Sequence, residues 1–510
     1  MTTSPAVLRP SGNPGTALSA LLPGAADVTV TGVSLDSRSI RPGDLYVALP
    51  GQATHGARFG AQAVAAGAAA VLTDADGAGQ LAGIGVPVAV VADPRAEMAR
   101  VAAEVYGRPG ERLALYGVTG TTGKTSTTFL LAAALTAAGR QVGTIGTLGF
   151  ALAGRPVASP RTTVTTPESP DLQALLAYLA EHGADTVAME VSSHALALHR
   201  VDELVFDVAA FTNLGRDHLD FHPSVEDYFQ AKASLFRDGR CRAAVVNVDD
   251  EHGLRLATEL RATGIPLLTT GAGGDYRPLG RELLADGTSL VRLGTPAGER
   301  EFTLGLLGEF NVRNAATAVA VLDAAGVDLD AALPGLAGAF VPGRMQRVEL
   351  SAGAPGVVVD FAHTPESVTA ALAALPPGRR IVVLGCGGDR DQAKRGPMGA
   401  AAALGADLVV VTDDNPRSEA PQAIRAAILA GAREAAAASG AEVVDGGGRA
   451  DAIRLALGAA RPGDWVAVLG KGHETGQQLA DRTVPFDDVS AVATTWAQLE
   501  IGRASCRERV

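Results

Sequence analysis

A glycine-rich loop carries the residue types that bind nucleotide phosphates. The stretch GVTGTTGKTSTT begins at Gly117 and includes Gly123-Lys124-Thr125, which opens a predicted helix. Backbone N–H groups of such a loop and of the helix after it can surround phosphate oxygens. The Lys124 ammonium can reach the β- and γ-phosphates, and the Thr125 hydroxyl can coordinate Mg²⁺. A strict P-loop has glycine at position 118, where this chain has Val118, so we predict a variant phosphate loop.

Two further apolar runs end in side chains that can hold a metal ion. The first run ends at Glu190, and a buried carboxylate is costly unless it is paired or bound to a metal. The carboxyl ends of parallel strands also form the ligand crevice of an open α/β sheet. The second run is followed by Asn213, Asp217, His218, Asp220 and His222. We predict that Glu190 and His218 contact Mg²⁺, with a salt bridge as the alternative for Glu190.

One predicted helix places a lysine among the residues that it should bury. The stretch HPSVEDYFQAKASLFRDG starts at His222, and Ser224 is a suitable N-cap. The apolar residues of this stretch recur at helical spacing, and they are Val225, Tyr228, Phe229, Leu235 and Phe236. Lys232 falls on the same face. Burial would lower the pKa of its amine, whereas in the alternative arrangement the long side chain reaches solvent.

Lysine is rare in this chain, so its positions are informative. Lys and Arg total 43, yet the only lysines are Lys124, Lys232, Lys394 and Lys471. Arginine serves well for surface charge, whereas a compact ammonium, or an amine that can lose its proton, requires lysine. We therefore expect these lysines to be functional more often than lysines in an average protein.

Composition argues against several classes of protein. The net charge is −12 and no long basic run occurs, which argues against nonspecific nucleic-acid binding. The longest apolar run, residues 61–91, contains Asp74 and Asp76 and is a poor membrane span. The first residues show no secretion signal, and three cysteines without metal-site spacing indicate free thiols in a reducing compartment. We expect a cytoplasmic monomer that binds neither nucleic acid nor membrane.

Short strands and helices alternate along the chain, which predicts an α/β fold with three domains. Residues 1–108 form a small N-terminal α/β domain, and residues 109–345 form a central P-loop ATPase-like parallel sheet. From residue 346 the buried runs GVVVDFAH, RIVVLGCGG, ADLVVVTDD and DWVAVLGKG predict a Rossmann-like C-terminal domain that ends at residue 501. Residues 502–510 are basic and lack an amphipathic pattern, and we treat them as a non-native tail.

The ordered motifs of the chain resemble the Mur ligase family, and within it the members that add a diamino acid to UDP-N-acetylmuramoyl-L-alanyl-D-glutamate. The matching stretches are GVTGTTGKTSTT, TTPES, MEVSSHALALHRV, FTNLGRDHLDFH, GEFNVRNAATA, VPGRMQRVE, DFAHTPES, GCGGDRD, TDDNPRSE and GKGHETGQ. They occur in the family's order and cover about Val28 to Asp488. The resemblance implies that the first domain binds the uridine nucleotide, the second ATP and the third the amino acid.

The resemblance also implies a reaction. ATP phosphorylates the D-glutamate carboxylate to an acyl phosphate, and an amine of the diamino acid attacks it to form an amide, ADP and phosphate. Several negative charges meet in such a transfer, so catalysis depends on positioning and on cations. Lys124 and two Mg²⁺ ions would supply the positive charge. Members of the family also carry a carbamylated lysine at the position of Lys232, formed from CO₂, which would hold Mg²⁺ beside His218.

Further site residues are implied by the same resemblance. The predicted ATP contacts are Gly120, Thr121, Thr122, Gly123, Lys124, Thr125, Ser126, Asn314, Arg344 and Asp360. The predicted contacts of the UDP-sugar peptide are Ser37, Thr54, His55, Gly56, Thr165, Thr166, Ser192 and Arg200. The predicted metal ligands are Thr125, Glu190, His218 and the carbamate of Lys232. Ordinary alternatives are a helix cap for Asn314, a surface ion pair for Arg344 and turn residues for Thr165 and Thr166.

A cluster after a buried strand suggests which diamino acid is added. Arg417 can bind a carboxylate through two hydrogen bonds. An ammonium group can be bound by Asp414, Asn415 and Glu474. The far end of meso-diaminopimelate has both groups, whereas lysine has no distal carboxylate. In the family, the motif DNPR goes with meso-diaminopimelate. The other predicted contacts of this substrate are Arg390 and Gly470.

Four alternatives remain open at this point. L-lysine or L-ornithine could replace diaminopimelate in the same reaction. A folylpolyglutamate synthase shares the ATP loop but should lack the motifs DNPR and GKGHE. A P-loop regulatory ATPase would need neither His218 nor Lys232. The Asp414–Arg417 segment could also be only a turn.

Overall fold

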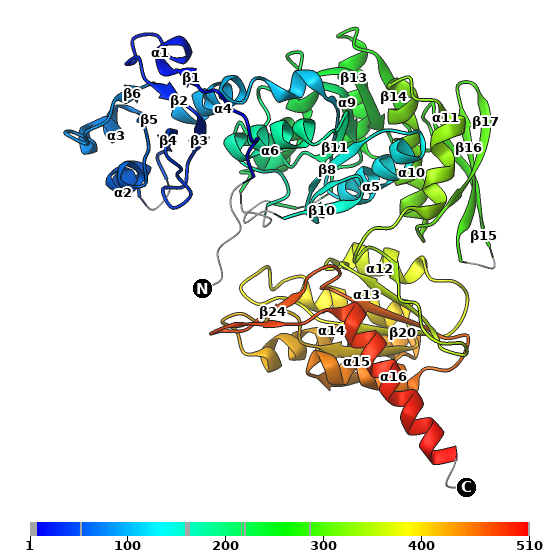
Figure 1. Cartoon of the computed structure of the whole chain (residues 1–510). Coiled ribbons are helices and arrows are strands. Elements are labelled where there is room, and N and C mark those ends of the chain that lie inside the picture. The colour runs from blue at the N-terminus through cyan, green and yellow to red at the C-terminus, as the bar shows by residue number, and fades with distance from the viewer. Residues whose placement is uncertain are drawn as a thin grey trace. The chain divides into compact units, whose positions relative to one another are not determined.

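The computed structural model describes residues 8–51, 54–158, 164–215, 217–218, 221–284 and 287–507, without the side chains of 502–507. The described chain forms two compact units (Figure 1). One consists of residues from 1–280, 291–303 and 313–338, and the other of residues from 281–290, 304–312 and 339–510. The predicted division into three domains at residues 108 and 345 stays a prediction.

The N-terminal part of the first unit contains a small parallel sheet in the order β3-β4-β5-β6. Its elements are β1 (Thr16–Ala17), α1 (Leu18–Leu21), β2 (Thr29–Val30), β3 (Gly32–Ser34), β4 (Asp44–Ala48), η1 (Gly56–Phe59), α2 (Gly60–Ala65), β5 (Ala70–Thr73), α3 (Ala75–Gln80), β6 (Val88–Val90) and α4 (Pro94–Val105). Alternate residues of β4 pack into two separate apolar clusters, Leu45 and Val47 in one and Tyr46 and Ala48 in the other. Both faces of this strand are therefore buried, as parallel sheets require.

The central sheet of the first unit has eight strands in the order β10-β9-β8-β11-β7-β12-β13-β14. Strands β8, β11, β7, β12, β13 and β14 are parallel. The elements up to β12 are η2 (Pro109–Arg112), β7 (Ala114–Thr119), α5 (Lys124–Ala137), β8 (Val142–Gly146), β9 (Gly149–Leu152), β10 (Arg155–Val157), α6 (Ser169–Glu181), β11 (Thr186–Glu190), α7 (Ser193–Ala197) and β12 (Phe206–Phe211). Strand β7 lies between β11 and β12, so chain order reverses beside it, which is where open α/β sheets bind ligands.

The remaining elements of this region continue the pattern and add a separate small sheet. They are α8 (Val225–Ala233), η3 (Ser234–Phe236), β13 (Cys241–Asn247), α9 (Glu251–Arg261), β14 (Leu267–Thr270), β15 (Arg277–Leu283), β16 (Ser289–Thr295), β17 (Gly298–Leu304), α10 (Glu309–Ala324), α11 (Leu329–Ala332) and η4 (Leu333–Gly338). Strands β15, β16 and β17 form a three-stranded sheet that the sequence analysis did not predict.

Helix α8 begins as predicted, but its apolar stripe differs in one residue. The Ser224 hydroxyl accepts a hydrogen bond from the Asp227 N–H and caps the helix. Tyr228 and Phe229 are buried in the helix, and Leu235 and Phe236 are buried in η3. Val225 is 40% exposed, so its prediction as a core residue is wrong. It is the first residue of the helix, which leaves its side chain at the solvated end of the apolar stripe.

The second unit contains a six-stranded sheet in the order β18-β19-β23-β20-β21-β22, in which only β18 is antiparallel to its neighbour. Its elements are β18 (Gln346–Arg347), β19 (Gly356–Asp360), α12 (Pro365–Ala373), β20 (Arg380–Leu384), α13 (Arg395–Gly405), β21 (Leu408–Thr412), α14 (Pro421–Ser439), β22 (Glu442–Gly447), α15 (Arg449–Ala459), β23 (Trp465–Leu469), β24 (Gly476–Gln478), β25 (Thr483–Pro485) and α16 (Asp488–Arg507). The sequence analysis missed β22. Helix α16 continues beyond residue 501, which the sequence analysis predicts as the end of the third domain.

Alternation along the central strands explains why helices cover both faces of this sheet. In β20, Val382 and Leu384 pack with α12, α13 and α14, whereas Ile381 and Val383 pack with α15 and α16. Successive side chains of a strand point to opposite faces. A strand with an uninterrupted apolar run therefore needs helices on both faces of the sheet to bury its side chains. The predicted α/β class with a Rossmann-like C-terminal sheet is confirmed.

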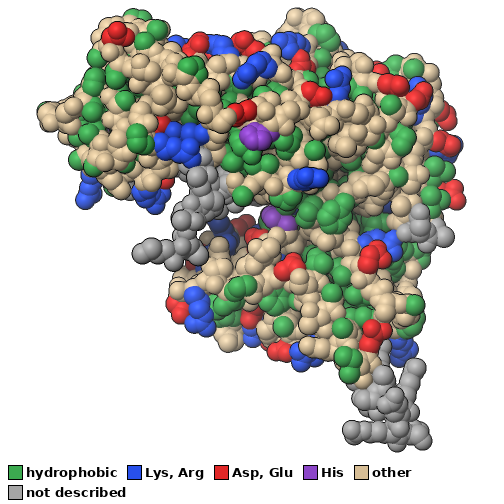
Figure 2. Space-filling model, in the orientation of Figure 1, with side chains coloured by type: hydrophobic (Ala, Val, Ile, Leu, Met, Phe, Trp, Pro, Cys, Tyr) green, Lys and Arg blue, Asp and Glu red, His purple; other side chains and the backbone are tan. Residues whose placement is uncertain are grey.

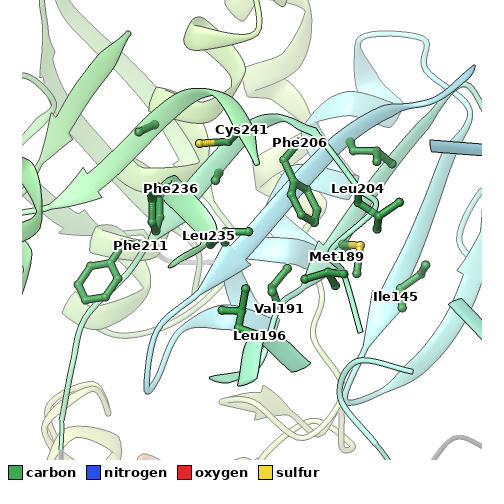
Figure 3. Close-up of a cluster of buried hydrophobic side chains, with 14 of the residues drawn as sticks. Ile145, Met189, Val191, Leu196, Leu204, Phe206, Phe211, Leu235, Phe236 and Cys241 are labelled. Atoms are coloured by element: carbon green, nitrogen blue, oxygen red, sulfur yellow. The ribbon is translucent and has the colours of Figure 1, made fainter. Parts of the chain in front are cut away.

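Two cysteines are buried free thiols. Cys241 is 6% exposed and lies in the core of the central sheet with Phe236 and Phe206 (Figure 3). Cys386 is 3% exposed and donates to the Met398 Sδ at 3.4 Å. Burial raises the pKa of both thiols to about 12. The side chain of Cys506 lies outside the described residues.

We expect these two thiols to be nearly inert in the folded protein. In a Cys506→Ser variant at pH 8, iodoacetamide should modify Cys241 and Cys386 at least about a hundredfold more slowly than in the denatured chain, because the thiolate is the reactive form. Peptide mass spectrometry after timed labelling measures both rates. Rapid labelling of either thiol in the native protein would contradict the burial described above.

Candidate active site

The predicted phosphate loop connects β7 to α5. Val118 is a fully buried strand residue that pairs with Glu190 of β11 and Ala210 of β12, which explains why no loop glycine stands at this position. The loop therefore starts at Gly120. Gly123 has a φ of +85°, and a Cβ on it would lie 2.5 Å from the Asn314 Oδ1. The structure thus brings Asn314 next to the loop, and its contact with a nucleotide stays a prediction.

The segment after β12 holds this loop in shape. The Thr121 N–H donates to the Asn213 carbonyl at 2.9 Å, and the Thr122 N–H donates to the Asn213 Oδ1 at 3.0 Å. The Thr212 hydroxyl donates to the Thr122 carbonyl at 2.6 Å. The sequence analysis names Asn213 among the polar residues after this strand, but it does not predict that Asn213 or Thr212 supports the loop. Their position directly after a strand that neighbours β7 was the available signal.

Two of the rare lysines meet at one carbonyl oxygen of the loop. The Lys124 Nζ donates to the Gly120 oxygen at 2.8 Å and to the Thr121 oxygen at 2.9 Å. The Lys232 Nζ donates to the same Gly120 oxygen at 2.7 Å. Lys232 is 1% exposed and its Nζ lies 4.5 Å from the centre of the Tyr228 ring. The predicted burial of Lys232 is confirmed, and the alternative in which its amine reaches solvent is wrong.

The surroundings of Lys232 disfavour its charged form. Burial, and then the nearby Lys124 ammonium, lower the pKa of Lys232 well below its usual value, and Asp217 acts weakly in the opposite direction. Among the described residues, no carboxylate forms an ion pair with Lys232. Two ammonium groups on one carbonyl oxygen repel each other, so this arrangement favours a Lys232 that is not a cation.

Glu190 lies at the mouth of the loop and is 1% exposed. Its Oε2 accepts hydrogen bonds from the Thr125 hydroxyl at 3.0 Å and the Thr147 hydroxyl at 3.1 Å. Its Oε1 accepts from the Thr147 N–H at 2.8 Å. A Cβ on Gly146 would lie 2.2 Å from this oxygen, so the end of β8 requires glycine there. Thr147 was missed by the sequence analysis, although it directly follows that strand.

The described part of the chain contains no basic side chain in an ion pair with Glu190, so the salt-bridge alternative finds no support. The structure brings together two of the predicted metal ligands, Thr125 and Glu190. No three His, Cys, Asp or Glu side chains converge as a metal site among the described residues. This is compatible with Mg²⁺, which uses one or two carboxylates and keeps several water ligands.

His218 lies on the side of the loop where Lys232 is found. Its side chain is 42% exposed, and its ring centre is 6.1 Å from that of Tyr228, whose ring also contacts the Lys232 amine. The His218 Nε2 is 3.5 Å from an Asp217 carboxylate oxygen. His222 is instead buried and its Nε2 lies 2.9 Å from the Ser193 hydroxyl. Asp220 lies outside the described residues.

Four of the predicted contacts of the UDP-sugar peptide form a hydrogen-bonded group beside Glu190. They are Thr165, Thr166, Ser192 and Arg200. The Thr166 hydroxyl donates to the Glu190 carbonyl at 2.8 Å, and the Ser192 N–H donates to the Thr166 hydroxyl at 3.1 Å. Arg200 donates to the Thr166 carbonyl at 3.0 Å and pairs with Glu168 at 2.7 Å. The Thr165 hydroxyl is 3.1 Å from that of Thr147. The hydroxyls of Thr165 and Thr166 therefore form contacts beyond a local turn, and their contacts with the substrate stay predictions.

The predicted uridine contacts follow neighbouring parallel strands of the N-terminal sheet. Ser37 comes after β3 and donates to the Gln62 Oε1 at 3.1 Å. His55 comes after β4; its Nδ1 accepts from the Ala57 N–H, and its Nε2 lies 3.0 Å from Asp74. Gly56 accepts from the Tyr46 hydroxyl and Thr54 is exposed. Their substrate contacts stay predictions.

In the second unit, Arg344 and Asp360 lie together. Asp360 accepts hydrogen bonds from the N–H groups of Met345 at 2.6 Å and Ala362 at 2.8 Å. Burial raises the pKa of Asp360, although Arg344 acts in the opposite direction. The Arg344 guanidinium lies 4.5 Å from the centre of the Phe361 ring, which makes a solvated surface ion pair a poor description of it.

The predicted diamino-acid residues gather at the carboxyl ends of β21 and β23. The Asn415 amide donates to Glu474 at 2.7 Å, and a Cβ on Gly470 would lie 3.5 Å from Asp414. Arg417 has a φ of +52° and donates to the Gly388 carbonyl at 2.7 Å and the Gln478 Oε1 at 2.9 Å. Arg390 is exposed and lies beside Gly387, where a Cβ would be 3.9 Å from its Cγ and 2.9 Å from an Arg417 nitrogen.

The sequence analysis missed a cation in this cluster. The Lys471 ammonium lies 3.6 Å from Asp414 and 3.3 Å from Glu474, and Lys471 is fully buried. The sequence analysis assigns these acidic groups to a substrate ammonium alone. The scarcity of lysine in the chain was the available signal.

Comparison with known proteins bears on the whole chain. Family models match residues 29–106 (Mur ligase family, catalytic domain), 118–322 (Mur ligase middle domain) and 343–472 (Mur ligase, glutamate ligase domain). A UDP-N-acetylmuramoyl-L-alanyl-D-glutamate–2,6-diaminopimelate ligase of Streptomyces coelicolor is 50% identical over 90% of this chain and 91% of its own. The chain belongs to the Mur ligase family.

Further Mur ligase relatives agree with this assignment. The enzyme with the same name from Streptomyces avermitilis is 48% identical over 91% of each chain. A solved structure of a UDP-N-acetylmuramoyl-L-alanyl-D-glutamate–2,6-diaminopimelate ligase is 30% identical, covers 95% of this chain and 99% of its own, and has a TM-score of 0.69. The predicted resemblance is confirmed, and the chain is a ligase.

Proposed function

We propose that this Mur ligase joins meso-diaminopimelate to the D-glutamate of UDP-N-acetylmuramoyl-L-alanyl-D-glutamate, with ATP converted to ADP and phosphate. The product is a cytoplasmic precursor of peptidoglycan. The choice of amino acid rests on the cluster of Asp414, Glu474 and Arg417. Its carboxylates can bind the distal ammonium of meso-diaminopimelate, and its guanidinium can bind the distal carboxylate. The names of the relatives support the same choice. L-lysine and L-ornithine remain alternative substrates.

The first chemical step is phosphoryl transfer. An oxygen of the D-glutamate carboxylate forms a bond to the γ-phosphorus, the bond to the β–γ bridging oxygen breaks, and ADP leaves with that electron pair. The loop from Gly120 to Thr125 and the amino end of α5 bind the phosphates through backbone N–H groups. Lys124 can leave the Gly120 carbonyl and move to the β- and γ-phosphates, where it offsets charge that develops in the transition state.

The second step forms the amide. The neutral amine of the diamino acid attacks the acyl carbon and gives a tetrahedral intermediate, which then loses phosphate and a proton. Thr166, Ser192 and Arg200 form a preorganised group beside Glu190 that we assign to holding the substrate peptide. Positioning of this kind supplies much of the rate enhancement when two bound reactants combine.

We further propose two Mg²⁺ sites. Thr125 and Glu190 would hold one ion, and His218 with a carbamate on Lys232 would hold the other. When bound, the ions neutralise phosphate charge during transfer. The Glu190 carboxylate suits this role because it is buried, already oriented by Thr125 and Thr147, and in no ion pair with a described residue.

The carbamate proposal rests on the environment of Lys232. An uncharged Nζ can attack CO₂, form an N–C bond and lose one proton, which yields an anion with two oxygens. Such a group would place an anion beside the Lys124 ammonium, so the two side chains would attract each other. The proposal is also a family feature, and its test is described in the Discussion.

We propose that the enzyme acts in the cytoplasm as a monomer on small-molecule substrates. None of the helices in the described residues is long and apolar enough to cross a membrane. On the face shown in Figure 2, Lys and Arg side chains are interspersed with Asp and Glu, which gives no continuous basic surface for nucleic acid.

An amino-acid panel tests the proposed function. The purified protein receives ATP, Mg²⁺, the UDP-muramoyl dipeptide and either meso-diaminopimelate, L-lysine or L-ornithine. We expect phosphate release and the tripeptide product only when both the dipeptide and the amino acid are present, with the highest kcat/KM for meso-diaminopimelate. A preference for lysine or ornithine would overturn the assignment of Arg417. Phosphate release with nucleotide alone would favour a regulatory ATPase, and use of a folate substrate would favour the folylpolyglutamate synthase alternative.

A further inference from the structure

Lys471 is a buried cation at the centre of the diamino-acid cluster. Its Nζ donates to the Gly476 carbonyl and lies 3.3 Å from the Glu474 Oε2 and 3.4 Å from the Asn415 Oδ1. It also lies 3.6 Å from the Asp414 Oδ1. The side chain of Lys471 is 0% exposed. The Lys471 ammonium therefore already interacts with the three side chains, Asp414, Asn415 and Glu474, that we assign to binding the ammonium group of the substrate.

The same cluster is tied to Arg417 through Gln478 on β24. The Gln478 N–H donates to the Asn415 Oδ1 at 2.9 Å, so Asn415 accepts from both Gln478 and Lys471. The Gln478 carbonyl accepts from the Arg417 N–H at 3.0 Å, and its side chain accepts from the Arg417 Nε at 2.9 Å. A substitution of Lys471 can therefore alter the position of Arg417 through Asn415 and Gln478.

Two observations indicate that the cluster is built to receive a ligand. The Asp414 Oδ1 is buried and accepts no hydrogen bond among the described residues, and the Lys471 ammonium lies 3.6 Å away as its ion-pair partner. Glu474 keeps 35% of its side-chain surface exposed and forms the open side of the cluster. Buried polar atoms are normally hydrogen-bonded, so the Asp414 Oδ1 can accept a hydrogen bond that the described residues do not supply.

The formal charges of the cluster match a zwitterion. Asp414 and Glu474 contribute two negative charges, and Arg417 and Lys471 contribute two positive charges. Arg449 lies nearby, but it is paired with Asp488 in a fully buried ion pair and is not counted. The distal end of diaminopimelate has one ammonium and one carboxylate and is neutral overall, whereas the distal end of lysine or ornithine is a cation.

We propose that Lys471 is a specificity-determining positioning residue, whose ammonium makes the site neutral overall and thereby favours a zwitterionic end over a simple ammonium. This inference rests on the proposed function and extends it to a residue outside the predicted set. Without Lys471, Arg417 is the one cation of this cluster that is counted against the two carboxylates, because Arg449 is paired with Asp488. The remaining negative charge repels the substrate carboxylate and attracts a distal ammonium that has no carboxylate beside it.

The experiment compares kcat/KM for meso-diaminopimelate and L-lysine in the wild type and in Lys471→Met. We expect KM for diaminopimelate to rise at least about tenfold, and the ratio of the two kcat/KM values to shift toward lysine by about tenfold or more, because selectivity follows differential binding. KM for ATP and for the UDP-muramoyl dipeptide should stay within about threefold of wild type, since those sites are assigned to other residues. An Arg433→Met variant is the matched control, because Arg433 is an exposed cation on α14 in the same unit.

A double variant separates charge from packing. Lys471→Met combined with Glu474→Gln is again neutral overall, so its preference should move back toward diaminopimelate relative to the single variant, even though the total rate is lower. If Lys471→Met lowers kcat/KM for both amino acids by the same factor, or if the double variant recovers no preference, Lys471 is only structural and the proposal fails. A wild type that does not favour diaminopimelate would instead refute the proposed function.

Discussion

Replacing Lys232 with methionine should reduce the rate of ligation at neutral pH by about a thousandfold or more. The expected cause is loss of the amine that we propose to become a metal-binding carbamate, since removing one preorganised charge at a phosphoryl-transfer site has effects of this size. The decisive readout is independent of activity. Wild-type protein in ¹³C-bicarbonate should give a bound ¹³C carbamate signal in NMR spectra, and Lys232→Met should not.

Stability distinguishes this effect from simple unfolding. Methionine has a similar length and removes a buried amine that forms no ion pair with a described residue, while the Gly120 oxygen still accepts from Lys124. The free energy of unfolding should therefore stay within about 1 kcal/mol of wild type or increase. Mild acid should lower wild-type activity by releasing CO₂ from the carbamate, and added bicarbonate should restore it. Near-normal activity in Lys232→Met, an absent ¹³C signal in the wild type, or no rescue by bicarbonate would each exclude the carbamate.

Replacing Glu190 with glutamine should lower kcat by about a hundredfold or more and raise the Mg²⁺ concentration that gives half-maximal activity. The amide has nearly the same shape, but it is neutral and binds hard cations poorly. The Thr125 and Thr147 hydroxyls can rotate to accept from the new amide, so the free energy of unfolding should change by less than about 1 kcal/mol. The measurement is a Mg²⁺ titration of ligation rate alongside denaturant unfolding.

Asp185→Asn is the matched control for this variant. Asp185 is an exposed carboxylate just before the amino end of β11, whereas Glu190 stands at the carboxyl end of the same strand. The control should keep the wild-type Mg²⁺ dependence. If Glu190→Gln shows an unchanged Mg²⁺ requirement, Glu190 orients the loop through Thr125 rather than binding the metal.

The phosphate loop shows how local sequence can predict part of a site. Gly123, Lys124 and Thr125 are adjacent in the chain, and the preceding apolar run and following helix leave few alternatives for their arrangement. Burial of Lys232 was also predictable, because helical spacing placed it on the same face as Tyr228 and Phe229. The same reasoning failed for Val225, since periodicity locates a face but does not say where along the helix that face becomes solvated.

Residues that meet from separate strands were harder to predict. Thr147 reaches Glu190 only because β8 and β11 are neighbours in the sheet, and Asn213 supports the loop only because β12 pairs with β7. Strand order is decided by long-range pairing, which a strand's own residues do not encode. For the same reason, the sequence offered no direct evidence that Lys232 and Lys124 share the Gly120 carbonyl.

The sequence by itself determined the α/β class, the phosphate loop, the family and the acid–amide–arginine cluster of Asp414, Asn415 and Arg417. Each depends on residues that are close in the chain or on an apolar pattern with a clear period. Only the tertiary structure decided the partners of these groups. The clearest case is Lys471, which follows β23 and meets Asp414 and Asn415 after β21 because both strands flank β20. We propose that its buried charge changes how the cluster selects a substrate.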